Sequence, residues 1–447
     1  MSEYKQPENE QEFSENFSQI KPLMTETQAY YESSRCLFCY DAPCINACPT
    51  GIDIPLFIRQ INAGNAIGAA KTIYDSNYFG YACGKVCPTE VLCEGACVYN
   101  HQQVKPIEIG RLQSFATGKA IHSDKKLFIT GKLKGKKVAV VGAGPAGISC
   151  ACELRMIGFD VDIFEAKEKP SGLTVYGVAP YKITNEEALD EMTYLEKQFG
   201  YRVHYNKPIK SKEEFENLEK KYDAIFIGVG LGKTSALKIR GEELENVFGA
   251  TEFIERLRMN HHKISVPKKV IVLGGGNTAM DAASESARMG AEKVILTYRR
   301  SKEEMPAYDF EYDLAKGVGV KGLFNVTPIE ILGENGKVIG VKFQYTPSLT
   351  HIKAPPPLGG RLEGPGEFIE PCDWVIKATG QTKQVEILKL IDGIHLDDKG
   401  KISVNEKFQT SNKKYFAAGD AVSGGQEVVN AVADGKRAAN GIKDLLS

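Results

Sequence analysis

Cysteines crowd into one short part of this chain. Eight of its 11 cysteines lie between residues 36 and 97, in two compact groups. The first group is Cys36, Cys39, Cys44 and Cys48, and the second is Cys83, Cys87, Cys93 and Cys97. Such runs of thiolates, with proline after two of the members, are typical of iron–sulfur clusters, where one cysteine of a run can ligate the other cluster. The spacing by itself predicts two all-cysteine sites.

Structural zinc sites and a disulfide framework are the alternative interpretations of these cysteines. Four-cysteine sites with short spacers also hold structural zinc, and this alternative stays open. A disulfide framework is disfavoured, because residues 1–14 are polar and acidic and do not resemble a signal peptide. Reduced thiols of the cytoplasm are therefore expected.

The composition is that of an ordinary globular protein. The chain has 447 residues, of which 42% are apolar and 25% charged, and such a length suggests about two to four domains. A net charge of −1 gives no indication of nucleic acid or an anionic membrane as partner. No apolar run approaches the roughly 20 residues that span a bilayer. We expect a cytoplasmic protein without membrane or nucleic-acid partners.

The N-terminal part is predicted to be helical. Residues 1–30 are expected to form a solvated, loosely packed tail, because chain termini are usually poorly ordered. Segments 55–62 and 66–74 have the apolar spacing of short amphipathic helices. These helices would hold the cysteine loops together in a small domain that binds two [4Fe-4S] clusters, predicted over residues 1–130.

The stretch 136–165 has the layout of a dinucleotide-binding unit. An apolar strand runs into a glycine-rich turn, a helix follows, and a second strand ends in an acid. Such glycines permit a tight turn and close approach of the backbone to a pyrophosphate. The helix N-terminus offers N–H groups to the phosphates, and the acid accepts hydrogen bonds from ribose hydroxyls. The predicted cofactor-binding residues are Gly142, Gly144, Pro145, Ala146, Gly147 and Glu165.

A second unit of the same kind begins at residue 268. Its predicted cofactor-binding residues are Gly274, Gly275, Gly276, Asn277, Thr278 and Ala279. Arg299 and Arg300 replace the acid at the end of its second strand. A guanidinium can bind a 2′-phosphate bidentately, whereas a carboxylate would repel it. This favours NADP(H) over NAD(H); the alternative is that the arginines only flank the strand in solvent.

Two nucleotide-binding units imply two nucleotides, a flavin and a nicotinamide. Segments 222–230 and 373–380 each read as a strand that ends in a glycine turn, and we assign both to the flavin unit. Segment 415–420 reads as a strand that leads into a C-terminal helix, whose first Asp can reach the ribityl chain of FAD or act as an ordinary N-cap. The residues predicted here are Ala378, Thr379, Gly380, Gly419, Asp420, Glu427 and Val428.

The fold class predicted is α/β. A small helical iron–sulfur domain is followed by two Rossmann-like domains. The FAD-binding domain is predicted over residues 131–245 and 366–447, and the NAD(P)H-binding domain, over 246–365, is inserted in it. No C-x-x-C lies near either nucleotide fold, which argues against a disulfide reductase. No nucleophile–base pair is found, so no catalytic side chain is predicted.

At this point the motifs resemble a known family. It is the family of flavin and iron–sulfur subunits that includes the glutamate synthase small subunit and the N-terminal half of dihydropyrimidine dehydrogenase. The resemblance covers essentially the whole chain and rests on both cysteine groups and on VGAGPAG, GGGNTAMD, YRR, ATGQ and AAGDAVSGGQEVVNAVADGKRAA. The chain looks most similar to the bacterial pyrimidine enzymes, because of its CPTEVLC spacing and the GRLQ that ends at Gln113. Relatives nearer glutamate synthase more often have GRLE there.

The resemblance implies a ligand assignment that spacing alone does not give. One cluster would be held by Cys36, Cys39, Cys44 and Cys97, and the other by Cys48, Cys87, Cys93 and Gln113. Cys83 would then be unligated. Segment 171–182 is similar to a flavin-contacting loop of the family and adds Gly172, Leu173 and Lys182, the last where the family usually has arginine. The resemblance also implies NADH for some members, which conflicts with the two arginines.

The function that the resemblance implies is that of an electron-input subunit. Electrons from NAD(P)H would pass through FAD and two [4Fe-4S] clusters to a partner that reduces uracil or thymine to 5,6-dihydropyrimidines. Since the three modules use all 447 residues, the catalytic subunit with FMN and iron–sulfur clusters is expected on a second chain of a hetero-oligomer. Two alternatives are a glutamate synthase small subunit (or a related ferredoxin or sulfur-compound reductase subunit) and a flavoprotein with a non-redox zinc-binding docking domain.

Overall fold

The computed structural model describes residues 3–346, 361–364 and 366–447. The chain divides into two compact units. The first unit comprises Met1–Ser18, Tyr176–Tyr181 and Gly232–Thr382. The second unit comprises Gln19–Val175, Lys182–Leu231 and Lys383–Ser447.

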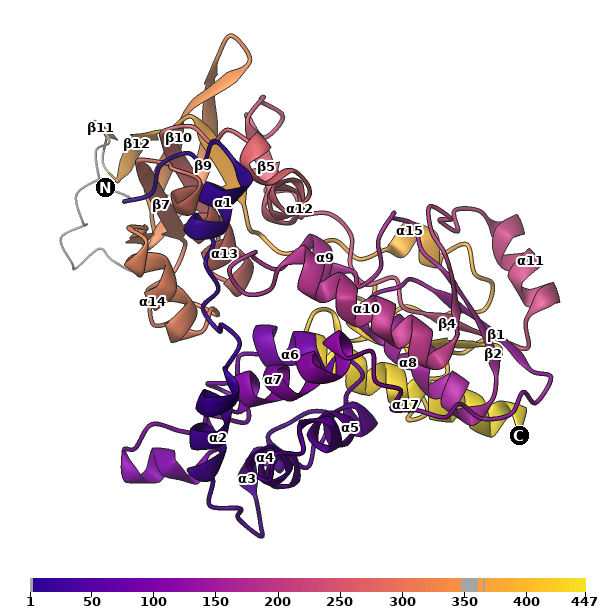
Figure 1. The fold of residues 1–447 in the computed structure, drawn as a ribbon. Coiled ribbons are helices and arrows are strands. Elements are labelled where there is room, and N and C mark those ends of the chain that lie inside the picture. The colour runs from indigo at the N-terminus through magenta and orange to yellow at the C-terminus, as the bar shows by residue number, and fades with distance from the viewer. Residues whose placement is uncertain (1–2, 347–360, 365) are drawn as a thin grey trace. The chain divides into compact units, whose positions relative to one another are not determined.

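The second unit begins with a helical part that carries the clustered cysteines (Figure 1). Its helices are α2 (Glu26–Ser34), α3 (Pro43–Asn46), α4 (Ile54–Asn62), α5 (Ala66–Ser76), α6 (Gly80–Val86) and α7 (Ile109–His122), with a 3-10 turn η1 (Val98–Gln102). The α4 and α5 helices confirm the two amphipathic helices that the apolar spacing predicts. Their buried faces place Phe57, Ile58 and Ile73 in one apolar core with Leu112 of α7. Several cysteines of both groups pack against this core.

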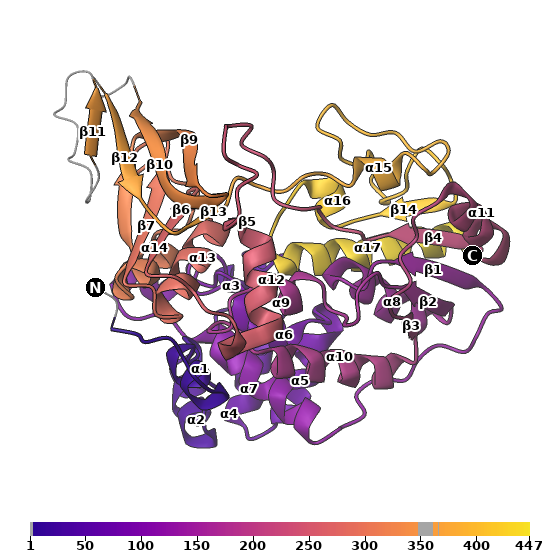
Figure 2. The ribbon, with the colours of Figure 1, turned by 90° about the horizontal axis from the view of Figure 1, so that it is seen from above.

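A five-stranded parallel sheet forms the rest of the second unit. Its strands, in spatial order, are β14 (Tyr415–Ala417), β4 (Ala224–Ile227), β1 (Lys137–Val141), β2 (Asp160–Phe164) and β3 (Arg202–His204). The accompanying helices are α8 (Pro145–Ile157), α9 (Leu173–Tyr176), α10 (Asn185–Phe199), α11 (Lys212–Lys221), α15 (Val385–Leu388), α16 (Asp420–Ser423) and α17 (Val428–Leu446). Figure 2 shows the C-terminal α17, in yellow, close to α8. The Ser149 hydroxyl donates to the Val432 carbonyl at 2.7 Å and joins these two helices.

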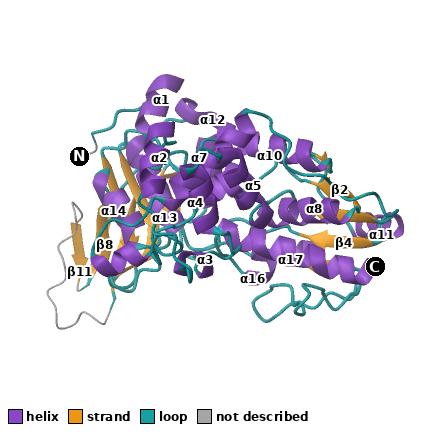
Figure 3. Ribbon diagram, turned by 60° about the horizontal axis from the view of Figure 1, so that its bottom comes forward, coloured by secondary structure: helices purple, strands orange, loops and turns teal. Residues whose placement is uncertain are grey.

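The first unit holds a parallel sheet and an antiparallel one. Their strands, among them β8 and β11, are drawn in orange in Figure 3. The parallel sheet is ordered β5 (Val247–Gly249), β13 (Trp374–Lys377), β6 (Lys269–Leu273), β7 (Lys293–Tyr298) and β8 (Lys321–Phe324). The antiparallel sheet is ordered β11 (Arg361–Gly364), β12 (Glu367–Pro371), β10 (Lys337–Tyr345) and β9 (Val326–Glu334). The helices are α1 (Glu10–Asn16), α12 (Ala250–Asn260), α13 (Asn277–Arg288) and α14 (Asp309–Gly317), with a 3-10 turn η2 (His261–Lys263).

The expectation of a solvated tail is wrong for the first 18 residues. Residues 3–18 fold onto the first unit, where Phe13 of α1 is buried and stacks on His261 with ring centroids 4.6 Å apart. Gln6 donates to the Ile264 carbonyl at 2.8 Å. The Asn16 side chain donates to the Arg288 carbonyl at 2.7 Å. The predicted helical domain over 1–130 therefore loses its first 18 residues to the other unit.

The predicted borders of the inserted domain also need correction. The strand at 374–377 exists as predicted, but it lies in the sheet of the first unit, between β5 and β6, and not in the sheet with β1. Accordingly the chain crosses between the units at 231–232 and at 382–383, not at 245–246 and 365–366. The crossing segments pair with each other, since Gly232 N–H donates to the Thr382 carbonyl at 2.8 Å.

Candidate functional site

In the first fingerprint turn, Gly142 and Gly147 pack closely against backbone, whereas Gly144 borders open space. Gly142 ends β1 with φ at +103°, a region that glycine enters without strain. A Cβ on Gly142 would overlap the Gly228 carbonyl oxygen, and one on Gly147 would overlap the carbonyl oxygen of Gly142. A Cβ on Gly144, the N-cap of α8, meets no atom within 4 Å. Because no side chain caps α8, this space lies before free helix N–H groups and fits a pyrophosphate.

Glu165 closes the fingerprint turn from the end of β2. Its carboxylate accepts from the Ala143 N–H at 2.7 Å and from the Lys167 N–H at 2.8 Å. The loop that begins at Ser171 is attached to the same turn, because Ser171 N–H donates to the Ala143 carbonyl at 2.7 Å. A Cβ on Gly172 would lie 3.0 Å from the Gly144 Cα.

Ala378, Thr379 and Gly380, which the sequence analysis assigns to the flavin unit, lie instead in the first unit. The other residues predicted for FAD fall into three places in the second unit. Gly419 approaches α8 so closely that an added Cβ would lie 3.0 Å from the Ala146 Cβ. Asp420 therefore begins α16 near the fingerprint turn, and burial raises the pKa of its carboxyl. Glu427 is the N-cap of α17 and Val428 its first residue. Pro145 is the first residue of α8, Leu173 is exposed and Lys182 is buried.

The second fingerprint repeats this geometry in the first unit. Gly274 packs against the Ala378 carbonyl after β13, and Gly275 packs against the Tyr298 ring. A Cβ on Gly276, the uncapped N-cap of α13, again meets no atom within 4 Å. On α13, the Asn277 side chain accepts from the Tyr308 N–H at 3.1 Å, Thr278 is exposed and Ala279 is buried. After β13, the Thr379 hydroxyl donates to the Ser235 carbonyl at 2.7 Å, next to Gly380.

Arg299 and Arg300 follow directly after β7, and both are exposed. Their backbones are held in place, because the Thr346 hydroxyl donates to the Arg299 carbonyl at 2.9 Å and the Asn325 N–H donates to the Arg300 carbonyl at 2.9 Å. Within the part of the chain that the structure describes, neither guanidinium forms an ion pair. Both are available to an anionic ligand.

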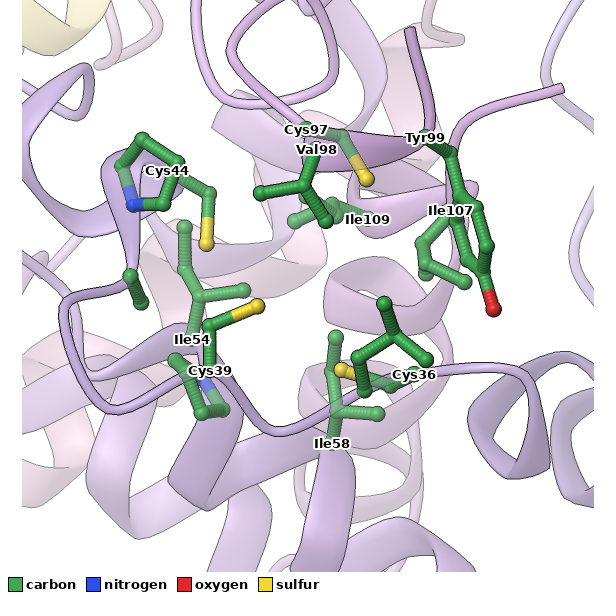
Figure 4. Close-up of a pocket in the computed structure, with 14 residues that line it drawn as sticks. Cys36, Cys39, Cys44, Ile54, Ile58, Cys97, Val98, Tyr99, Ile107 and Ile109 are labelled. Atoms are coloured by element: carbon green, nitrogen blue, oxygen red, sulfur yellow. The ribbon is translucent and has the colours of Figure 1, made fainter. Parts of the chain in front are cut away.

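Four cysteines line one pocket in the helical part of the second unit, namely Cys36, Cys39, Cys44 and Cys97. Figure 4 shows their sulfur atoms pointing toward a common space among isoleucines 54, 58, 107 and 109. The pKa of Cys44 is raised to about 12, mainly by burial and further by electrostatic repulsion from the neighbouring Cys36 and Cys97. Thiols in such a pocket keep their protons until a metal centre displaces them. The pocket joins cysteines of both sequence groups, as in the ligand set implied by the resemblance.

Three further cysteines of that assignment interact with one another. The pKa of Cys87 is raised mainly by a hydrogen bond with Cys83 and by burial. Electrostatic repulsion from Cys48 raises it further. Burial also raises the pKa of Cys93, with contributions from Cys87 and Cys48. A hydroxyl reaches the group as well, since the Cys48 sulfur lies 3.2 Å from the Thr50 oxygen.

Gln113 is buried on α7, and its amide has a fixed orientation. Its Nε2 donates to the Gly80 carbonyl at 2.6 Å. Because a carbonyl oxygen can only accept, the nitrogen must face Gly80, and Oε1 is the amide atom with lone pairs for a ligand. Lys21, which the sequence does not single out, donates to the Cys87 carbonyl at 3.1 Å. This donor set suits an iron–sulfur cluster with one oxygen ligand.

Two kinds of feature are absent from the described residues. Among residues 3–346, 361–364 and 366–447, no group of three or more His, Cys, Asp or Glu side chains is arranged to hold a single metal ion. In the same residues no helix combines the length and the apolar character needed to cross a bilayer.

Comparison with known families covers nearly the whole chain. Residues 13–125 match the family described as dihydropyrimidine dehydrogenase domain II, 4Fe-4S cluster. Residues 136–435 match the pyridine nucleotide-disulphide oxidoreductase family. The first match supports iron–sulfur clusters and not the zinc alternative.

Two Escherichia coli (strain K12) relatives are equally similar to the chain. The glutamate synthase [NADPH] small chain is 34% identical over 450 residues, which cover 96% of this chain and 94% of that protein. The NAD-dependent dihydropyrimidine dehydrogenase subunit PreT is 33% identical over 428 residues, which cover 96% of this chain and 97% of that protein. The predicted resemblance is thereby confirmed.

Solved structures confirm the predicted α/β fold. FprA of Mycobacterium tuberculosis in complex with NADPH aligns with a TM-score of 0.54 and 18% identity, over 69% of this chain and 84% of that one. Thioredoxin reductase of T. acidophilum aligns with a TM-score of 0.52 and 22% identity, over 70% of this chain and 100% of that one. The chain belongs to the pyridine nucleotide-disulphide oxidoreductase family and, with its N-terminal 4Fe-4S domain, is an iron–sulfur oxidoreductase that uses FAD and NAD(P)H.

Proposed function

We propose that the chain is the electron-input subunit of a dihydropyrimidine dehydrogenase. It would deliver electrons from NAD(P)H to a second chain that carries FMN and iron–sulfur clusters and reduces uracil or thymine. The observation that carries the proposal is Gln113, buried on α7 with its amide nitrogen on the Gly80 carbonyl and its oxygen left as a ligand. The similarity to PreT over 97% of that protein supports it.

Each unit would bind one of the two nucleotides. In the second unit, Gly144 leaves room at the uncapped start of α8 for the FAD pyrophosphate, and Glu165 lies at the turn for its ribose. In the first unit, Gly276 and α13 have the same roles for NAD(P)H, and the guanidinium of Arg299 binds a 2′-phosphate. The chemistry that these residues would hold in place is hydride transfer from NAD(P)H to bound FAD and release of single electrons to the clusters.

The cysteine domain would hold two clusters. We assign the first to Cys36, Cys39, Cys44 and Cys97, and the second to Cys48, Cys87, Cys93 and Gln113. An apolar core packs against cysteines of both sets, and such a hydrophobic surrounding influences the reduction potential of a cluster. No acid or base side chain is required, because the cofactors carry out the chemistry.

A second candidate is the small subunit of a glutamate synthase. The 34% identity to the glutamate synthase small chain over 94% of that protein favours it. The site residues would be unchanged, and only the partner and the final acceptor would differ.

Capture of the partner separates the two candidates. The tagged chain is isolated under native, anaerobic conditions from its own organism, and its partners are identified by mass spectrometry. We expect an FMN-binding partner of roughly one barrel domain or more, about 250 residues or larger, and NAD(P)H-dependent reduction of uracil by the complex. A large glutamine-hydrolysing partner, with no uracil reduction, would refute the pyrimidine assignment in favour of glutamate synthase.

A further inference from the structure

The first turn of α6 is held from two sides by buried side chains of other helices. From α7, Gln113 Nε2 donates to the Gly80 carbonyl at 2.6 Å. From α10, the Glu191 carboxylate accepts from the Tyr81 N–H at 2.6 Å and from the Ala82 N–H at 3.0 Å. The Gly80 carbonyl and the Tyr81 N–H belong to the same peptide group. Glu191 and Gln113 are therefore hydrogen-bonded to opposite ends of one peptide.

This arrangement is buried and hydrogen-bonded throughout. Glu191 is 0% exposed and Gln113 is 6% exposed, and both lie in the second unit. The Tyr74 hydroxyl of α5 adds a third hydrogen bond to the Glu191 carboxylate at 3.0 Å. One turn earlier on α10, Glu187 accepts from the Tyr81 hydroxyl at 2.6 Å and helps to fix α6 in place. With water excluded, hydrogen bonds in series strengthen one another.

A charge on Glu191 acts along this series in a defined direction. A carboxylate that accepts from the Tyr81 N–H polarises the peptide and places more negative charge on the Gly80 oxygen. That oxygen then binds the Gln113 N–H more strongly, which in turn polarises the Gln113 amide. The result is more negative charge on Gln113 Oε1, the atom assigned to the second cluster. Hydrogen-bond partners of metal ligands commonly set ligand orientation and basicity in this way.

We propose that Glu191 is a positioning residue for Gln113. Through the Gly80–Tyr81 peptide it fixes the amide so that oxygen faces the iron, and it strengthens that oxygen as a ligand. Because a stronger donor disfavours an added electron, Glu191 lowers the reduction potential of the second cluster. The inference rests on the proposed function, in which Gln113 ligates that cluster.

The charge state of Glu191 fixes the conditions of the test. Burial raises the pKa of its carboxyl to about 7, although its three hydrogen bonds oppose the shift. The titratable groups that face it are Tyr74 on α5, Tyr81 on α6, Cys152 on α8, Glu187 on α10 and Tyr201 after it. At pH 8.5 the carboxylate is ionised and the relay is complete.

The test is a redox titration of the full-length holoprotein, followed by EPR, at pH 8.5. E191Q removes the charge and keeps the size, so the midpoint potential of one cluster should rise while that of the other stays unchanged. Tyr74→Phe removes a hydrogen bond to the same carboxylate but leaves the relay intact, and it should shift neither potential. E187Q removes a negative charge one turn away without touching the peptide. Unshifted potentials in E191Q, or an equal shift in E187Q, would overturn the proposal.

Repeating E191Q in a second variant distinguishes an effect relayed through hydrogen bonds from a direct electrostatic effect of the Glu191 charge on the cluster. In Gln113→Glu the oxygen ligand is retained, but the side chain at 113 no longer donates to the Gly80 carbonyl. E191Q should cause no further shift there, and a shift that persists would refute the relay. A holoprotein without EPR-active clusters would overturn both this inference and the proposed function. Clusters that are present, with E191Q unshifted, would overturn the relay alone.

Discussion

The clearest prediction contrasts two alanine substitutions three residues apart in the first fingerprint turn. In Gly147→Ala the new Cβ comes closer than 3.0 Å to the Gly142 carbonyl, a backbone atom that cannot move alone. In Gly144→Ala the new Cβ meets no protein atom within 4 Å. Gly144 has φ at −77°, a value that alanine adopts without strain. The first change should damage the protein, and the second should damage only the cofactor site.

The expected magnitudes follow from these contacts. Forcing a methyl group against packed backbone costs about 1–3 kcal/mol or more, so Gly147→Ala should unfold the FAD-free chain at a clearly lower temperature. Gly144→Ala should leave that temperature unchanged. Its methyl group would push the pyrophosphate away from one or two helix N–H donors, each worth about 1.5–3 kcal/mol. FAD affinity should therefore fall about tenfold to ten-thousandfold.

Both effects are measured on the same preparations. Thermal unfolding of the FAD-free chain reports stability, and quenching of flavin fluorescence on titration reports affinity. The full-length wild-type chain is the reference for both. Gly144→Ala with wild-type FAD affinity would refute the inference that the pyrophosphate lies over this glycine. Gly147→Ala with wild-type stability would refute the packing argument.

Four further outcomes are expected. Arg299→Ala should raise the KM for NADPH about tenfold to hundredfold, by loss of one charge-assisted contact, and leave the KM for NADH unchanged; equal changes for both nucleotides would contradict the 2′-phosphate argument. By EPR, Cys97→Ser should remove one cluster and Cys48→Ser the other, and loss of the same cluster in both would refute the ligand sets. Phe13→Ala should destabilise the first unit by about 3 kcal/mol, seen as faster hydrogen exchange in α12; unchanged exchange would show that the N-terminal segment is dispensable. Burial raises the pKa of Glu191 from 4.5 to about 7, so the stabilising contribution of the protonated carboxyl is present below pH 4.5 and is lost as the pH rises to 7. The free energy of unfolding of E191Q should therefore increase relative to that of the wild type by roughly 3 kcal/mol between pH 4.5 and 8. A difference in thermal stability that stays constant with pH would contradict this.

Local patterns in the sequence predict the nucleotide-binding elements well. The apolar strands β1 and β6, with the glycine turns after them, are predictable because strand period, turn chemistry and helix start all lie within about 30 neighbouring residues. The strand 374–377 is also predictable as a strand. Its sheet is not, because pairing with β5 and β6 is a contact between distant parts of the chain.

The N-terminal segment shows the same limit. Phe13 and Phe17 are buried, but they stand in a polar stretch, and Phe13 packs on His261, far along the chain. Tertiary packing therefore overrides the local signal. The burial of Glu191 could have been predicted from the sequence, because Glu191 falls on the apolar face of α10 together with Ala188 and Leu195. An acid on such a face is a signal for a buried, hydrogen-bonded carboxylate.

The central claim is that the chain holds two [4Fe-4S] clusters, one of them with an oxygen ligand. Mössbauer spectroscopy of the 57Fe-enriched, full-length protein, with iron counted against FAD, tests it most directly. The account predicts about eight iron atoms per FAD, all in [4Fe-4S] clusters, with one iron site distinct from the thiolate-bound sites. Four iron atoms per FAD, or eight in uniformly thiolate-bound sites, would contradict it.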